Sequence, residues 1–161
     1  MVIYLVVFSF SSIMFYLSSK SKRTARSNFW AIIGIFALAV LAGLRDASVG
    51  TDVNVYGRLF YQQAVNSSSF MHYFSSRVDS LLSEPGFHFL TYFLSRLFKD
   101  YHWGLFLYQL IPLICIYLGM RRCGKIFNTP VWLGMLLYNV MLYNSSLNIM
   151  RQCIAVGFVF Y

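Results

Sequence analysis

Residues 2–44 read VIYLVVFSFSSIMFYLSSKSKRTARSNFWAIIGIFALAVLAGL, two apolar segments on either side of a short basic loop. The apolar segments, residues 2–17 and 29–44, each contain 16 residues, or roughly 24 Å of α-helix, slightly less than the hydrocarbon core of a bilayer. Tyr16 and Trp30 are suited to the membrane–water interface and would complete the spans. The pattern predicts two transmembrane helices joined by a short loop.

The composition of the whole chain is that of a membrane protein. Of its 161 residues, 58% are hydrophobic and only 11% are charged, whereas roughly 25% of the residues of a soluble domain are charged. The sequence contains no P-loop, HExxH or GxSxG motif, and its histidines and cysteines are not at metal-ligand spacings. An ATPase, a metalloprotease or a serine hydrolase is therefore not supported, and we expect neither a metal nor a cofactor.

The net charge of +8 comes mainly from two basic clusters between apolar segments. These clusters consist of Lys20, Lys22, Arg23 and Arg26, and of Arg121, Arg122 and Lys125. Because short loops on the cytoplasmic side of a membrane are rich in Lys and Arg, we expect both clusters to be cytoplasmic and the N-terminus to lie outside. The basic residues are not interleaved with exposed aromatic residues, so no nucleic-acid partner is expected.

Three further apolar segments, residues 103–120, 130–143 and 147–161, also predict transmembrane helices, the last two joined by a turn at residues 144–146. Residues 86–98 are apolar over only 13 positions, which predicts a re-entrant or tilted helix. Two cytoplasmic loops require an even number of crossings between them, and residues 29–44 and 103–120 already supply two, so residues 86–98 should not cross the membrane fully.

The sequence thus predicts an all-α fold, a polytopic integral membrane bundle with about five spanning helices in one domain, residues 1–161. Because the chain ends at Tyr161 within an apolar segment, we expect it to be a truncated form.

Residues 45–85 are mixed polar and aromatic, and we expect them to form an extracytoplasmic amphipathic segment. Thr51 or Asp52 can cap a helix over residues 53–65, and a linker at residues 66–69 precedes a second helix. Pro85 is expected to begin the next helix, with Ser83 or Glu84 as its cap.

Charged residues near hydrocarbon are expensive, and they indicate function when they occur. Arg151 follows Asn148 by three residues, so we expect both on one face at the start of a helix, where a phosphate would be favoured. Arg45 directly follows the second apolar segment, and Asp52 comes seven residues later, after a possible tight turn at Gly50. Anchoring at the interface or helix capping would also explain these residues, and Glu84 is either a cap or a general base.

Three motifs together resemble the EpsG family, Wzy-like membrane proteins of bacterial exopolysaccharide and capsule synthesis. They are AGLRDASVGTD at residues 42–52 with Tyr56, EPGF at residues 84–87 with Leu90, and NIMRQ at residues 148–152 with Ala155. The resemblance covers essentially the whole chain, as the N-terminal half of a family member.

The resemblance implies polymerisation of oligosaccharide repeat units carried on undecaprenyl diphosphate, at the outer face of the bacterial cytoplasmic (inner) membrane. It implies a glycosyltransferase that uses no nucleotide sugar and no obligatory metal, with membrane lipid, a flippase and a chain-length regulator as partners. The alternative is a non-catalytic transporter or export subunit for the same lipid-linked glycan.

Under this resemblance, Arg45 and Arg151 would hold the diphosphate and stabilise the developing charge of the leaving group, with Arg151 as the catalytic arginine. Asp52 or Glu84 would activate the acceptor hydroxyl, and the residues leave this choice open. Tyr56 and Phe87 would offer aromatic faces to sugar rings. The predicted substrate-binding set is completed by Thr51, Asn148 and Gln152.

Overall fold

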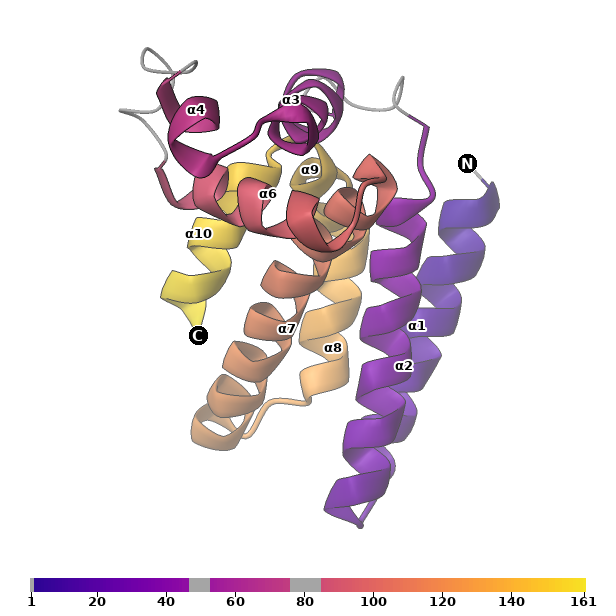
Figure 1. The fold of residues 1–161 in the computed structure, drawn as a ribbon. Coiled ribbons are helices and arrows are strands. Elements are labelled where there is room, and N and C mark those ends of the chain that lie inside the picture. Colours follow the sequence, from indigo (N-terminus) through magenta and orange to yellow (C-terminus); the bar gives the residue numbers. More distant parts are fainter. Residues whose placement is uncertain (1, 47–52, 76–84) are drawn as a thin grey trace. The chain divides into compact units, whose positions relative to one another are not determined.

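The computed structural model describes residues 2–46, 53–75 and 85–161 of the chain. Every regular element within these ranges is helical, which confirms the predicted all-α class (Figure 1). The chain forms two compact units. We call Met1–Leu44 together with Phe106–Tyr161 the bundle unit, and Arg45–Leu105 the inserted unit.

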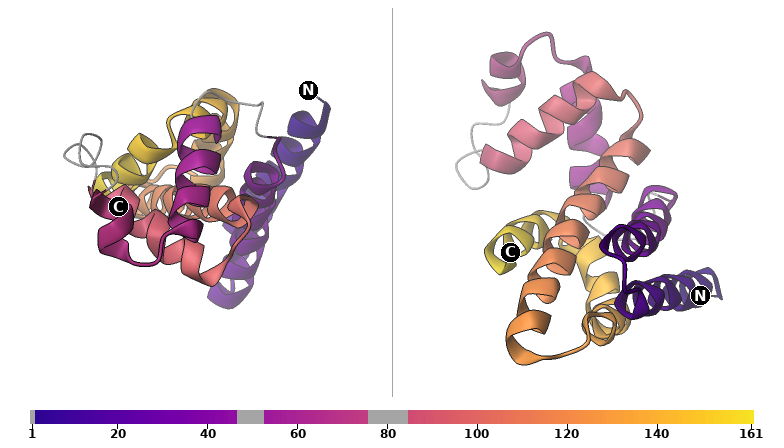
Figure 2. Two further views of the ribbon diagram at one scale, coloured as in Figure 1. Left: turned by 45° about the horizontal axis from the view of Figure 1, so that its top comes forward. Right: turned by 90° about the horizontal axis from the view of Figure 1, so that it is seen from below.

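The first two helices of the bundle unit are α1 (Val2–Lys20) and α2 (Thr24–Gly43), and they run side by side (Figure 1, Figure 2). Both extend into the predicted basic loop, which is only three residues long. Gly34 permits the close contact between them, because a Cβ atom there would lie 3.2 Å from the ring of Phe15. Ser11 Oγ donates a hydrogen bond to Gly34 O at 3.2 Å, so this polar side chain is satisfied inside the pair.

Helix α7 (Tyr101–Phe127) begins in the inserted unit and continues into the bundle unit. It contains the second basic cluster in its last turns, so these residues are helical and not part of a loop. Within the described residues, α1, α2 and α7 are the helices long and apolar enough to cross a membrane. The chain is therefore a membrane protein, whereas the predicted count of five spans stays a prediction.

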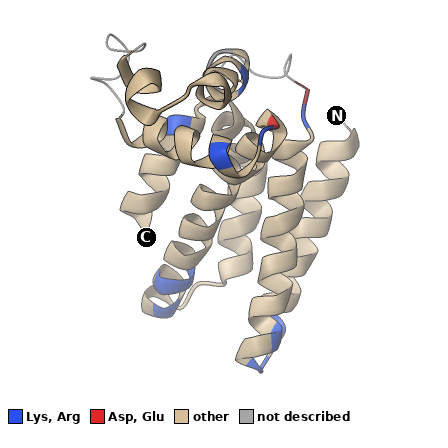
Figure 3. Cartoon of the chain, in the orientation of Figure 1, with Lys and Arg blue, Asp and Glu red and all other residues tan. Residues whose placement is uncertain are grey.

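The two basic clusters lie at the same end of the bundle unit (Figure 3). Arg121 at the end of α7 donates a hydrogen bond to Asn28 Oδ1 near the start of α2, with a distance of 2.7 Å. Two clusters at one end are what the positive-inside rule requires of loops that share a side of the membrane. The assignment of that side to the cytoplasm stays a prediction.

The C-terminal part of the bundle unit is helical over residues 131–148, with a π-helical segment in its middle. Its elements are α8 (Val131–Leu137), η2 (Tyr138–Leu142) and α9 (Tyr143–Asn148), followed by α10 (Met150–Phe160). The turn predicted at residues 144–146 is therefore wrong, and so is the predicted helix start near Leu147. The helix breaks instead at Ile149, whose φ of −109° and ψ of 46° are not helical.

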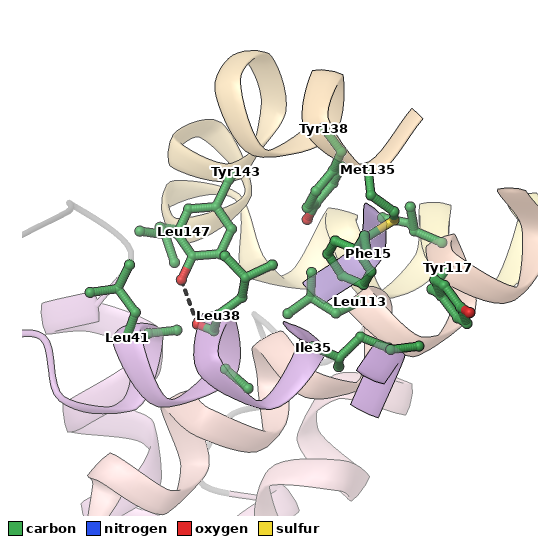
Figure 4. Close-up of a cluster of buried hydrophobic side chains, with 14 residues drawn as sticks. Phe15, Ile35, Leu38, Leu41, Leu113, Tyr117, Met135, Tyr138, Tyr143 and Leu147 are labelled. Carbon is green, nitrogen blue, oxygen red and sulfur yellow. Dashed lines mark hydrogen bonds between the residues drawn. The ribbon is translucent and has the colours of Figure 1, made fainter. Parts of the chain in front are cut away.

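The core of the bundle unit joins residues from helices that are distant in the sequence (Figure 4). Phe15 of α1 stacks on Tyr117 of α7 with ring centroids 5.8 Å apart. Tyr143 of α9 donates a hydrogen bond to Leu38 O of α2 at 2.6 Å, within this apolar cluster. In a low-dielectric interior such a bond is strong, and it satisfies the buried hydroxyl group of Tyr143.

The inserted unit contains η1 (Val53–Leu59), α3 (Phe60–Asn66), α4 (Phe70–Ser75) and α6 (Pro85–Leu97), together with the first residues of α7. The helix predicted over residues 53–65 is confirmed, although its first half is π-helical. Pro85 begins α6 as predicted, since its fixed φ suits the first helical position and it has no amide hydrogen to satisfy. Helix α6 packs against α3 and α4.

Candidate functional site

Several predicted site residues lie outside the described part of the chain. They are Thr51, Asp52 and Glu84, which include both candidate general bases. Tyr56 lies in η1, where only its backbone is described. The choice between Asp52 and Glu84 therefore stays open.

Arg45 follows directly on α2, whose C-cap Leu44 donates its amide to Val40 O at 2.9 Å. The Arg45 side chain is only 5% exposed, whereas the neighbouring Asp46 is exposed. A guanidinium group in such a low-dielectric position attracts an anion more strongly than one in water. The burial is therefore compatible with the predicted role of Arg45 in anion binding.

Phe87 and His88 are both buried on the inner face of α6. Phe87 thus packs inside the inserted unit, and its ring meets the His88 ring edge-on at 6.2 Å, rather than lying open for a sugar as expected. His88 Nδ1 is 3.1 Å from Tyr73 Oη, and the Phe60 ring stacks on the imidazole at 5.5 Å.

The sequence analysis found no metal-ligand spacing for His88 and did not predict its contact with Tyr73. The signal was present in the periodicity of α6. His88 shares one helical face with Phe87, Thr91 and Leu94, all of which are buried. A histidine on the buried face of an amphipathic helix requires a hydrogen-bond partner, which a tyrosine hydroxyl supplies here.

Tyr61 and Arg96 join α3 to α6 at one end of the inserted unit. Tyr61 Oη lies 2.6 Å from Phe98 O and 3.1 Å from Leu94 O, and it can donate to either carbonyl. Arg96 Nη2 donates to Ala64 O at 3.0 Å and also to Ser67 O. Each side chain thus bonds to carbonyl oxygens at the C-terminal end of the other helix, where fewer intrahelical donors are available.

Arg151 occupies the first turn of α10, as predicted. The helix begins after Ile149, which offers no side-chain oxygen to cap it, and its first turn contains no acidic residue. An arginine in the first turn of a helix favours an anion, because the helix dipole is positive at that end. Asn148, however, ends α9, so the expectation that Asn148 and Arg151 share one face of a single helix is wrong. The break at Ile149 separates them, while Gln152 follows Arg151 in α10 and is exposed.

A groove with a volume of about 260 Å³ lies between α7, η2, α9 and α10. Its lining consists of Ile116, Met120, Tyr138, Leu142, Ser145, Ser146, Ile149, Cys153, Val156 and Phe160, most of them apolar. Ile149 and Cys153 flank the first turn of α10, so the groove adjoins the backbone of the segment that contains Arg151. The sequence analysis did not predict this groove, because it forms from helices that are not adjacent in the sequence.

A buried polar cluster lies beside this groove. Gln109 of α7 donates from Nε2 to Ser146 Oγ at 2.8 Å and to Tyr138 Oη at 3.4 Å, and both acceptor residues line the groove. Ser146 Oγ in turn donates to Tyr143 O at 2.7 Å. Gln109 Oε1 has no hydrogen-bond partner within the described residues. Polar side chains in a membrane bundle are uncommon and mark positions where a polar ligand group can bind.

In comparison with known proteins, the chain matches the family model described as the EpsG family over residues 28–161. No curated protein and no solved structure matches the chain. The family match covers most of the bundle unit and the whole inserted unit, and the apolar helices agree with it. The chain is thus a membrane protein connected with polysaccharide biosynthesis, and it belongs to the EpsG family.

Proposed function

We propose that the protein polymerises oligosaccharide repeat units carried on undecaprenyl diphosphate, at the outer face of the bacterial cytoplasmic membrane. The observation that carries this proposal is the position of Arg151 in the first turn of α10, next to residues that line an apolar groove. An amphiphile with an anionic head and a hydrocarbon chain matches both features.

The head group would interact with Arg151 and the first-turn amides of α10. In the proposed reaction, the acceptor hydroxyl forms a bond to the anomeric carbon while the bond from that carbon to the diphosphate oxygen breaks. The lipid diphosphate leaves with the electron pair and gains negative charge. A guanidinium group and amide dipoles that face this charge stabilise the transition state more than the ground state.

The hydrocarbon chain of the carrier would occupy the groove between α7 and α10. Its lining is supplied by side chains such as Ile116, Met120 and Val156. Burial of an isoprenoid chain there is favoured by close packing rather than by exclusion of water, since the surrounding lipid is equally apolar. The groove would therefore orient the carrier more than it would add affinity.

Asp52 or Glu84 would accept the proton of the attacking hydroxyl, and the buried Arg45 would provide a second positive charge for the diphosphate. A carboxylate is an effective general base when its pKa approaches the working pH. The sugar-binding surface is proposed to include Tyr56, while the buried position of Phe87 makes it a packing residue of the same unit.

The test is the amount and sidedness of lipid-linked oligosaccharides in cells that lack the complete gene. A polymerase defect leaves single repeat units displayed on the outer face and removes long polymer. Single units trapped on the cytoplasmic face would instead identify a transporter, the competing assignment, which would use the same arginines without catalysis. An unchanged profile would contradict both.

A further inference from the structure

Helix α6 has a second apolar face, which the described part of the inserted unit leaves largely exposed. Phe89, Phe93 and Leu97 are 61%, 53% and 59% exposed. Their spacing of four residues places them on one side of the helix, opposite the face that contains the buried Phe87, Thr91 and Leu94. We call these three residues the apolar stripe.

The apolar stripe continues onto the neighbouring helix α4. The ring of Phe70 meets Phe89 edge-on with centroids 5.9 Å apart, and Met71 beside it is 73% exposed. Apolar side chains that form a contiguous exposed patch over two helices require a partner, because single exposed apolar residues are ordinary but patches are not.

The end of α6 is held close to the start of the membrane helix α7. Only residues 98–100 separate the two helices, which is at most about 11 Å of extended chain. Phe98 stacks on Trp103, with ring centroids 5.1 Å apart and an interplanar angle of 20°, so the corner is fixed within the inserted unit. Trp103 is itself half exposed, as is common for tryptophan at a membrane interface.

The length of α6 excludes a full crossing. Its 13 residues extend over about 20 Å, well short of a hydrocarbon core of about 30 Å. Its polar inner residues, His88, Thr91 and Ser95, are covered by protein, whereas the apolar stripe is open. Such a distribution is that of a helix that lies in the interface plane.

We propose that α6 is an interfacial helix that lies parallel to the bilayer surface, with the apolar stripe in contact with lipid acyl chains. The lipid bilayer is the partner because the membrane helix α7 begins three residues beyond α6 and Lys99, between them, is exposed for contact with phosphate head groups. Helix α3 then lies on the water side of α6, while Phe70 and Met71 of α4 extend the lipid contact. This inference concerns the attachment of the inserted unit and does not depend on the reaction proposed above.

The test uses the full chain with its three cysteines replaced by alanine and one new cysteine at a time, labelled with an environment-sensitive fluorophore. The probe positions are Phe89→Cys, Phe93→Cys and Leu97→Cys, and the matched control is Arg58→Cys, which is also exposed but lies on η1. Each protein is reconstituted into vesicles of phosphatidylcholine and phosphatidylglycerol that contain nitroxide lipids, labelled either near the head group or near the chain end.

We expect all three stripe positions to lose fluorescence more strongly with the shallow nitroxide than with the deep one, and to similar extents. The Arg58→Cys control should respond to aqueous iodide and not to either lipid. A graded response, in which one stripe position is quenched best by the deep nitroxide, would overturn the proposal in favour of a re-entrant helix. Absence of lipid quenching at the apolar stripe would also overturn the proposal, and the stripe would then face a protein partner or water. Crosslinking to a second copy of the chain would identify a protein partner.

Discussion

Tyr61 and Arg96 close the C-terminal ends of each other's helices. The tyrosine hydroxyl of α3 reaches the carbonyl oxygens of Leu94 and Phe98 on either side of Arg96, and the guanidinium group of Arg96 returns to Ala64 O and Ser67 O. The Arg96 guanidinium also lies 4.5 Å from the centroid of the Tyr92 ring. These two residues thus connect α3 and α6 through hydrogen bonds, in addition to the apolar contacts between the helices.

Replacement of Tyr61 by phenylalanine should loosen the end of α6. The change removes one hydroxyl and retains the ring, so the expected cost is about 1–2 kcal/mol of stability. Hydrogen–deuterium exchange in detergent micelles should show faster exchange of the last-turn amides of α6. Tyr101→Phe is the matched control, since Tyr101 makes a ring contact with His102 that phenylalanine keeps. Equal exchange in both variants would contradict the capping role.

The same hydroxyl predicts a loss of stability at alkaline pH. Burial, with a smaller contribution from the negative charge of Asp100, raises the pKa of Tyr61 from 10.0 to about 12. The folded state therefore holds the proton more tightly than the unfolded state, so this contribution is complete below pH 10 and declines as the pH rises toward 12. Unfolding of the wild-type protein should become easier over this range, and the dependence should be weaker in the Tyr61→Phe variant.

Gly104 should tolerate no side chain, because it faces the ring of Tyr61. A Cβ atom at Gly104 would lie 2.7 Å from that ring, and we expect Gly104→Ala to cost about 1–3 kcal/mol through overpacking. Gly86→Ala is the control, since no other part of the described chain, apart from its neighbours and its own helix backbone, lies within 4 Å of its Cβ position. Thermal unfolding of the purified protein should separate the two variants. If Gly104→Ala were as stable as Gly86→Ala, Tyr61 would not be packed as described.

Arg151 should be required for long polymer. If it stabilises the leaving diphosphate, Arg151→Ala should lower the rate of polymerisation by about 10²–10³-fold, as does the loss of one transition-state donor in other enzymes. Arg151→Lys should recover only part of the activity, since lysine keeps the charge but lacks the planar fork. Polymer length and yield in a deletion strain give the measurement. Arg26→Ala, which removes an exposed arginine from the first basic cluster, should leave both unchanged.

The groove makes a separate prediction about α10. Val156 lines it, whereas Val159 on the same helix does not and is 88% exposed. Val156→Trp should fill part of the groove and reduce polymer yield at unchanged protein level. Val159→Trp adds the same volume toward lipid and should have little effect. Equal yields in the two variants would exclude the groove as the site of the carrier chain.

The helical hairpin and the start of α6 were predictable because local signals determine them. Apolar length defines α1 and α2, and Pro85 has a fixed preference for the first helical position. The exact ends were less predictable: α2 begins at Thr24, because basic residues at a membrane surface are good helix formers and continue the helix past the apolar segment.

The prediction of a turn at residues 144–146 was wrong because the structure of this segment depends on residues that are far away in the sequence. Asparagine and serine favour turns when their side chains bond to nearby backbone. Ser146 does form such a bond, to Tyr143 O, but it also accepts one from Gln109, 37 residues earlier, and Tyr143 is fixed to Leu38. These tertiary partners stabilise the helix through α9, and no local pattern could indicate them.

The candidate site was predictable only in outline. Arg151 could be placed in a first helical turn because an apolar segment follows it directly. Its position relative to Asn148 could not be predicted, because no glycine or proline in the sequence indicates the helix break at Ile149. The burial of Phe87 and the contact between His88 and Tyr73 depend on how α6 packs against α3 and α4, which the sequence alone leaves undetermined.

The π-helical segment η2 has the effect of one residue added to an otherwise α-helical stretch. A chain shortened by one position there could keep α8 where it is, but every later side chain would turn by about 100° around the helix axis. Tyr143 would then face away from Leu38, and Ser146 away from Gln109. The additional residue in η2 therefore determines the direction in which all later side chains of this segment point. Deletion of one residue in η2 should be more harmful than most substitutions there.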